Sequence, residues 1–237
     1  MNWGYNTIGV FQNQDQINNW PVNIDGKGNT TLLPGDFIVE DVNGDGRIDS
    51  QDERPIAYQD NSSVAPQPII NGGLTLGFDW KGIDLSADFS LAGGYAFTPN
   101  WETRWPFQNG RTLVRETQFK NRWRHEDPFD PNSAWIPGDV PALRFTAREY
   151  VSWNRNLDYW TTNVVAFRLR SLEIGYTLPR KWLAAARIQK VRFYVNTYNL
   201  FSIDNVKKYG VDPEIADRNG MQYPQNRVVN IGANLTF

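Results

Sequence analysis

The stretch RVVNIGANLTF, residues 227–237, places an apolar side chain at every second position. The apolar positions are Val229, Ile231, Ala233, Leu235 and Phe237, and polar or small residues stand between them. Because successive side chains of an extended strand point to opposite faces, this alternation gives one apolar face and one polar face. The stretch therefore predicts a β-strand that shields only one of its faces from water.

The same alternation recurs upstream in GGLTLGFDW (72–80), KGIDLSADFSLAGGY (81–95), NVVAFRLRSLEIGYTLP (163–179) and KVRFYVNTYNLF (190–201). The first two stretches meet at residues 79–82, DWKG, whose final glycine is typical of a tight hairpin turn. In the third stretch the parity of the apolar positions changes after Leu169, so we expect a β-bulge near Arg170 and Ser171. The sequence therefore predicts an all-β chain with antiparallel strands.

Strand and loop lengths favour one all-β architecture. The expected strands at 83–92, 164–178, 190–201 and 227–237 can each cross a bilayer, which takes about 9–11 residues. The long connections 1–67, 98–162 and 203–226 alternate with short ones at 79–82 and 179–189, so every long segment falls on one side. That parity, together with a last strand that ends on Phe237, is typical of a membrane barrel. We predict an antiparallel transmembrane β-barrel segment, a partial barrel of about five or six strands with long extracellular loops.

The expected organisation has two parts. Residues 1–67 form an extracellular loop region, and residues 68–237 hold the C-terminal strands of a barrel, with long loops at 98–162 and 203–226. The alternation by itself also fits a soluble sandwich whose polar faces meet water. The alternative interpretation is therefore a secreted, Ca²⁺-stabilised, carbohydrate-binding β-sandwich.

Composition narrows the class of protein. The net charge is −2 and the cationic residues form no stripe, so no nucleic acid is expected as a partner. The chain has no cysteine, which removes disulfides and thiolate chemistry. No apolar run is long enough for a membrane helix. Aromatic residues make up 14%, which fits either the aromatic girdles of a membrane barrel or a tryptophan-rich sugar-binding domain.

The opening MNWGYNTIGVFQ lacks the pattern of a signal peptide, so the chain is either cytosolic or a piece of a longer protein.

One motif, DVNGDGRIDSQD at residues 41–52, has the spacing of a Ca²⁺-binding loop. The expected ligands lie at loop positions one, three, five, seven, nine and twelve: Asp41, Asn43, Asp45, the carbonyl of Arg47, Asp49 and Asp52. Asp52 stands where such loops usually have a bidentate glutamate, and prolines on both sides exclude the usual flanking helices. We predict a structural Ca²⁺ site; the alternative is a turn rich in Asn, Asp and Gly that holds no metal.

The sequence offers no catalytic set, and the chain is not expected to be an enzyme. His125 is the only histidine, and no phosphate-binding or dinucleotide-binding motif is present. The long segment 98–162 is instead rich in tryptophan, and sugars stack on exposed aromatic faces. We expect ligand contacts at Trp101, Trp105, Trp123 and Trp135, although packing within the loop or a girdle would explain the same residues.

Several segments together resemble one protein family. GDFIVEDVNGDGRIDSQDERPI (35–56), VAFRLRSLEIGYTLPRKWL (165–183), VRFYVNTYNLFSI (191–203), YGVDPEI (209–215) and MQYPQNRVVNIGANLTF (221–237) are similar, in order, to stretches of SusC/RagA-type TonB-linked outer-membrane proteins. GVFQNQDQI (9–17) resembles a further family stretch, whereas Ala57 stands where the family has glycine.

This resemblance implies the C-terminal part of an outer-membrane nutrient importer for glycans or oligopeptides. The family barrel has about 22 strands and an N-terminal plug. TonB, reached through an N-terminal part missing here, would supply energy, and a SusD-like lipoprotein would cap the outside. The expected surroundings are the lipid of the outer membrane of a Gram-negative, Bacteroidetes-like cell. A partial barrel leaves two strand edges that lipid cannot satisfy, so we expect no transport by this chain alone.

Overall fold

The computed structural model describes residues 2–57, 68–108, 114–186, 188–214, 223 and 225–237. The chain forms two compact units. The first comprises residues 1–66, 96–163 and 216–221, and the second comprises 67–95, 164–215 and 222–237. Parts of the expected loops 1–67, 98–162 and 203–226 therefore lie outside the described residues.

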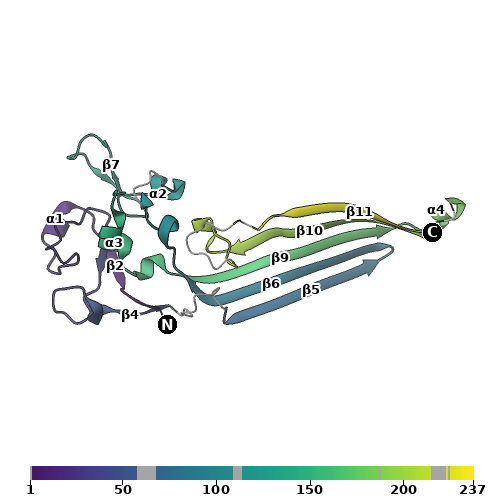
Figure 1. Ribbon diagram of the computed structural model, residues 1–237, viewed down its shortest axis with the longest axis horizontal. Helices are drawn as coiled ribbons and strands as arrows, with labels where there is room; N and C mark the ends of the chain where they lie inside the picture. Colours follow the sequence, from purple (N-terminus) through teal and green to yellow (C-terminus); the bar gives the residue numbers. More distant parts are fainter. Residues whose placement is uncertain (1, 58–67, 109–113, 187, 215–222, 224) are drawn as a thin grey trace. The chain divides into compact units, whose positions relative to one another are not determined.

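The second unit is built on one five-stranded sheet (Figure 1). Its strands are β5 (Ile70–Trp80), β6 (Ile83–Phe97), β9 (Thr162–Thr177), β10 (Lys190–Asp204) and β11 (Val228–Thr236), and their order across the sheet is β11-β10-β9-β6-β5. The pairs β5–β6, β9–β10 and β10–β11 are antiparallel. This confirms the predicted all-β antiparallel class, which fits a partial barrel.

The hairpin between β5 and β6 and the irregularity in β9 both lie where the sequence predicts them. Lys81 and Gly82 have φ of 49° and 89°, as a two-residue turn with the right twist requires. The neighbours Arg170 and Ser171 both reach the polar face of β6, since Arg170 Nε donates to Ser90 Oγ and Ser171 Oγ donates to Asp88. The change of facing thus lies where the sequence predicts it, and the β9–β10 register shifts at the same level, between Tyr198 and Phe201.

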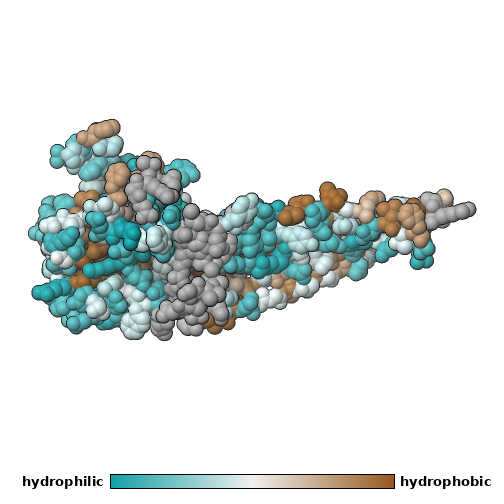
Figure 2. Space-filling model, viewed as in Figure 1, coloured by the Kyte–Doolittle hydropathy of each residue, from teal (hydrophilic) through white to brown (hydrophobic). Residues whose placement is uncertain are grey.

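The apolar face of the sheet is open to the surroundings of the chain. Leu76 and Phe78 on β5 are 49% and 55% exposed, and Ile231 on β11 is 83% exposed. Hydrophobic side chains are accordingly visible at the surface of the strands in Figure 2. Large apolar side chains so exposed mark a surface that another medium or molecule covers.

The first unit has a hydrophobic core of its own. Its short strands pair as β1 (Asn2–Gly4) with β4 (Arg54–Ala57), β2 (Thr7–Val10) with β3 (Phe37–Val39), and β7 (Arg124–His125) with β8 (Trp135–Ile136). Its helices are α1 (Gln14–Asn18), α2 (Glu116–Lys120) and α3 (Val151–Asn154), with 3₁₀ turns at Ser50–Asp52, Trp101–Thr103, Ala147–Glu149 and Asp158–Trp160. The core gathers Phe11, Ile17, Ile24, Leu32, Phe37, Ile38, Val39, Ile48, Ala147, Trp153, Leu157 and Trp160.

The remaining helical segments lie in the second unit. They are α4 (Arg180–Leu183) and the 3₁₀ turns Ala184–Ala186 and Lys207–Tyr209. Across the described part of the chain, no helix has both the length and the apolar character needed to span a membrane.

Candidate functional site

Hydrogen bonds and ion pairs connect the polar residues of four neighbouring strands, β5, β6, β9 and β10. Asp88 of β6 accepts hydrogen bonds from Thr75 Oγ1 of β5, at 2.7 Å, and from Ser171 Oγ of β9. Arg192 of β10 donates to Asp84 of β6 and to Glu173 of β9. These polar side chains therefore satisfy one another's hydrogen-bonding groups, and together they form a hydrophilic wall.

Two arginines of β9 hold the segment that follows β10. Arg168 Nη2 lies 2.7 Å from Asp212 Oδ2 and Nη1 lies 3.3 Å from Glu214 Oε2. Arg170 Nη2 also pairs with Glu214. The Arg168 side chain is only 5% exposed, whereas that of Arg170 is 43% exposed, so Arg168 makes the more strongly shielded anchor.

The loop at 41–52 has the backbone of a tight turn built around carboxylates. Gly44 and Gly46 have φ of 74° and 79°, and their N–H groups donate to Asp41 Oδ1 and Oδ2. Asp45 N donates to Asn43 Oδ1, and Arg47 N donates to Asp45 Oδ1. The side-chain oxygens expected at loop positions one, three and five are thus all oriented by backbone donors.

Asp52, expected at loop position twelve, is fully buried and closes the loop. Its Oδ1 accepts from Val42 N at 2.8 Å and its Oδ2 from Asp49 N at 2.9 Å. Burial by itself raises the pKa of Asp52, but the backbone N–H donors of Asp49, Val42 and Asn43 outweigh burial and lower the pKa. Asp49 caps the next 3₁₀ turn by accepting from Gln51 N.

The donor set fits Ca²⁺ in chemistry, because carboxylate, amide and carbonyl oxygens are the hard ligands that this ion prefers. The loop is also anchored to its unit, since Asn23 N donates to Gly46 O and Arg155 Nη2 donates to Ile48 O. Among the described residues, no three acidic or histidine side chains converge on one point. Asn43, Arg47 O and one or more waters would therefore have to complete any coordination shell.

Two of the expected ligand-contact residues form a pair. Trp101 and Trp105 pack edge to face with their ring centroids 6.0 Å apart. The Arg148 guanidinium lies 4.8 Å from the Trp105 ring centroid, and Trp105 Nε1 donates to Trp153 O. Trp101 is 43% exposed, so it keeps an open surface.

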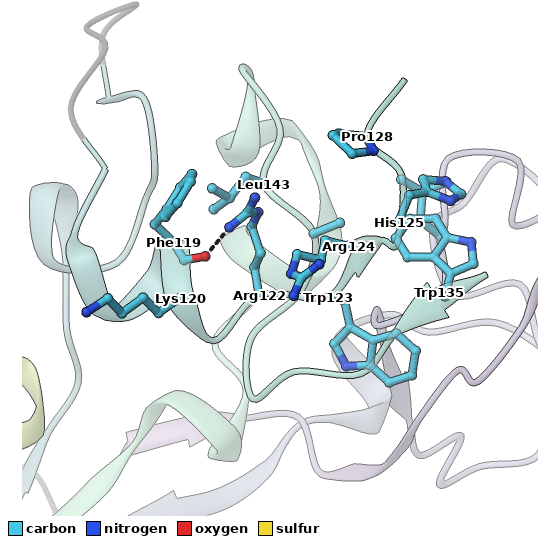
Figure 3. A pocket seen from close by; sticks show the side chains of 11 residues that line it. Phe119, Lys120, Arg122, Trp123, Arg124, His125, Pro128, Trp135 and Leu143 are labelled. Carbon is cyan, nitrogen blue, oxygen red and sulfur yellow. Dashed lines mark hydrogen bonds between the residues drawn. The ribbon is translucent and has the colours of Figure 1, made fainter. Parts of the chain in front are cut away.

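The other two belong to a cavity of about 680 Å³ that is shown in Figure 3. Trp123 is only 5% exposed and packs against Gly35, whose missing side chain makes room for it. Trp135 lies against His125, with the ring centroids 4.0 Å apart. His125 Nδ1 is also 2.9 Å from Ser133 O, so these contacts give the only histidine of the chain a structural place in the β7–β8 hairpin.

Sequence reasoning did not anticipate the other residues that line this cavity. The lining also includes Phe119, Lys120, Arg122 and Arg124. The extended segment 122–125 puts Arg122 and Arg124 on one side by its two-residue period, and this was the available signal. Nothing local in the sequence connects that segment to Trp135 or Leu143.

The chain is similar to two curated proteins over most of its length, although no family model matches it. TonB-dependent receptor P3 of Formosa agariphila is 26% identical over 256 residues, which is 99% of this chain and 22% of that protein. TonB-dependent receptor P39 of the same organism is 25% identical over 223 residues, which is 88% of this chain and 19% of that protein. The chain thus spans about a fifth of the length of these curated relatives.

Solved structures agree on the fold. The RagAB peptide importer in its open-open state matches 99% of this chain and 22% of its own, with a TM-score of 0.57 and 22% identity. The closed-closed state gives a TM-score of 0.58 and 23% identity over 99% and 23% of the two chains. The chain is similar to part of a SusC/RagA-type TonB-dependent receptor. The resemblance carried by the sequence motifs is thereby confirmed.

Proposed function

We propose that this chain is the C-terminal part of an outer-membrane TonB-dependent importer that takes up glycans or oligopeptides. The observation that carries the proposal is the division of the five-stranded sheet into an exposed apolar face and a hydrogen-bonded polar face. Acyl chains would cover the first, which includes Leu76 and Ile231. The second, which includes Asp84, Asp88 and Arg192, would face an aqueous lumen.

The alternative β-sandwich is less well supported. A sandwich buries one face of each sheet beneath the other sheet, at a spacing of about 10 Å. Leu76, Phe78 and Ile231 are about half or more exposed, as a lipid-facing strand requires. Relatives named as receptors, and a neighbour named as a peptide importer, add weight to transport over sugar binding by a secreted module.

The importer proposal includes partners and a location. A SusD-like lipoprotein would bind the extracellular side, TonB would act through a part of the protein outside this chain, and the location would be the outer membrane of a Bacteroidetes-like cell. Support comes from the family resemblance and from the organism of the relatives.

Fractionation and uptake test the proposal on the full-length protein that contains this chain. We expect the protein in the outer-membrane fraction, co-purification of a lipoprotein, and uptake of a labelled oligosaccharide or oligopeptide that stops when TonB is deleted. A soluble full-length product, or unchanged uptake without TonB, would contradict the proposal. Parallel arms with oligosaccharides and with oligopeptides decide between the two substrate classes.

We further propose that the loop 41–52 binds Ca²⁺ as a structural ion. The expected ligands are Asp41, Asn43, Asp45, the Arg47 carbonyl, Asp49 and Asp52. Their side chains would have to move together around the ion, because among the described residues no three acidic side chains converge on one point. The test is Tb³⁺ luminescence and Ca²⁺ competition on the full-length protein. We expect saturable binding that Asp41→Asn with Asp45→Asn abolishes, while Asp15→Asn, an exposed control on α1, leaves it unchanged. Equal binding by both variants would reject the site.

A further inference from the structure

The cavity in Figure 3 is lined by both aromatic and cationic side chains. Its described wall carries the aromatic rings of Phe119, Trp123 and Trp135 and the cations Lys120, Arg122 and Arg124, with no acidic residue among them. Its volume of about 680 Å³ falls in the range of about 300–1,000 Å³ that is usual for ligand pockets. The cavity therefore combines flat apolar surfaces with a positive field.

The positive charge of this wall is weakly compensated. Lys120 pairs with Glu116 one helical turn away, in an exposed ion pair of little energetic weight. Arg122 and Arg124 take part in none of the ion pairs found in the described residues. Burial, and then the charge of Arg124, lower the pKa of Arg122. An anion placed between the two guanidinium groups would relieve this repulsion.

Backbone hydrogen bonds fix part of the cavity wall in the absence of a ligand. Trp123 N donates to Val140 O at 2.9 Å, and Asn121 O accepts from both Asp139 N and Val140 N. Gly138 packs so closely here that a Cβ would lie 2.5 Å from the carbonyl carbon of Arg122. The segment 121–123, which includes the wall residues Arg122 and Trp123, is thus fastened to the segment 138–140 by backbone contacts. A wall that is already fixed lowers the ordering cost of binding.

The rings have an arrangement suited to a sugar. The Arg122 guanidinium lies 4.0 Å from the Phe119 ring centroid, and Trp135 is steadied by His125. Aromatic rings next to guanidinium groups offer a stacking surface beside a bidentate partner for a carboxylate or sulfate. A peptide would need backbone donors and acceptors along the groove, and the lining side chains supply chiefly rings and cations.

We propose that this cavity binds an acidic sugar residue, with its ring against Trp135 and its anionic group on Arg122 and Arg124. This inference rests on the importer function and specifies a substrate class for it, an acidic oligosaccharide. The neutral part of the ligand gives contact area, and the anionic group gives selectivity over neutral glycans.

The test measures binding to the full-length protein in detergent by isothermal calorimetry. The probes are trigalacturonate, neutral maltotriose and the acidic peptide triglutamate. We expect trigalacturonate to bind, and to lose about tenfold or more in affinity in Arg122→Gln with Arg124→Gln. The matched control Lys27→Gln with Lys208→Gln removes the same charge from exposed positions outside the cavity and should leave affinity unchanged. Trp135→Ala should weaken trigalacturonate by about tenfold without affecting any binding of triglutamate.

The possible outcomes distinguish acidic-sugar binding from a non-specific charge effect, and failure of this inference from failure of the importer proposal. Equal loss in both double variants would mean a non-specific charge effect, and tighter binding of maltotriose or of triglutamate would overturn the acidic-sugar assignment. If the double variant fails to fold, Arg124→Gln alone replaces it, because Arg124 is exposed and its loss should be tolerated. A protein that reaches the outer membrane and imports other solutes, yet binds no trigalacturonate, would refute this inference alone. A protein that never reaches the membrane would refute the importer proposal.

Discussion

Arg192 of β10 reaches over β9 to pair with Asp84 of β6, with Arg192 Nε 3.0 Å from Asp84 Oδ1. Gly175 of β9 occupies the crossing point: a Cβ there would lie 2.5 Å from Asp84 Oδ2 and 2.6 Å from Arg192 Nε. The ion pair therefore depends on the absence of a side chain in the strand between its partners. The glycine within GYTLP is explained by this crossing, since its own φ is not in the left-handed region.

Gly175→Ala should displace this ion pair and lower the stability of the full-length barrel by about 1 kcal/mol. The matched control is Gly77→Ala on β5, where an added Cβ meets nothing within 4 Å. The control should be neutral or slightly stabilising, because glycine weakens strands. Heat-dependent gel migration of the two variants in detergent provides the measurement. A control as damaged as Gly175→Ala would show that the crossing has no special role.

The strands and the hairpin could be predicted because their signals are local. The alternation in 83–92 and 227–237 needs only near neighbours, and the turn at residues 79–82 is set by its own backbone. The β-bulge near Arg170 could also be predicted, because the apolar positions switch from odd to even residue numbers there. That switch can be seen without knowing the partner strand. The strand ends were predicted less well: β6 and β10 extend beyond the predicted ends, to Phe97 and Asp204, whereas β11 is one residue shorter at each end than the predicted strand 227–237.

The core of the first unit and the cavity could not be predicted. Their contacts join residues far apart in sequence, as when Phe37 N donates to Ser152 Oγ across 115 residues. Segments 1–67 and 98–162 have no sustained period, so the sequence predicts loops there, although Trp153 within the second segment is fully buried. The spacing predicts the whole loop from Asp41 to Asp52, but it does not predict that Asp52 is buried and accepts hydrogen bonds from Val42 N and Asp49 N.

Leu76→Arg should destabilise the full-length barrel by about 2–4 kcal/mol if Leu76 lies near the bilayer midplane, because the exposed face of β5 would place a charge in lipid. Thr75→Arg, one residue away on the polar face, is the matched control, since Thr75 already contacts Asp88, which would pair with the new cation. Outer-membrane yield and unfolding in urea with lipid vesicles report the effect. Similar damage from both substitutions would contradict a lipid-facing side for Leu76.

Arg168→Met should loosen the segment after β10 more than Arg170→Met does. Removal of Arg168 leaves Asp212 without its shielded cation, a change that costs about 3–5 kcal/mol for buried pairs. The exposed Arg170 should contribute less than about 1 kcal/mol. Trypsin cleavage after Lys207 and Lys208, which lie between β10 and Asp212, should quicken in the first variant and stay nearly constant in the second. Equal cleavage rates would place the anchor elsewhere.

Asp52 makes the loop at 41–52 sensitive to acid. Its pKa is lowered in the folded protein, so the ionised carboxylate contributes stability above the ordinary value of 3.8 and loses that contribution as the pH falls through the lower, folded value. Protonation would remove an acceptor from Val42 N or Asp49 N, both of which donate to this one side chain. Amide hydrogen exchange at these two positions, corrected for the intrinsic rate, should therefore accelerate as the pH is lowered below about 4.

Asp52→Asn should reproduce the effect at neutral pH, since an amide sets a donor against a backbone donor and costs about 1–3 kcal/mol. Exchange in this variant should be fast and nearly independent of pH. Asp45→Asn is the matched control within the same loop, because Asp45 is exposed and keeps an acceptor oxygen for Arg47 N. Measuring both variants in EDTA separates the carboxylate's hydrogen bonds from any Ca²⁺ contribution. Retained protection in Asp52→Asn under those conditions would show that the loop is closed by other contacts.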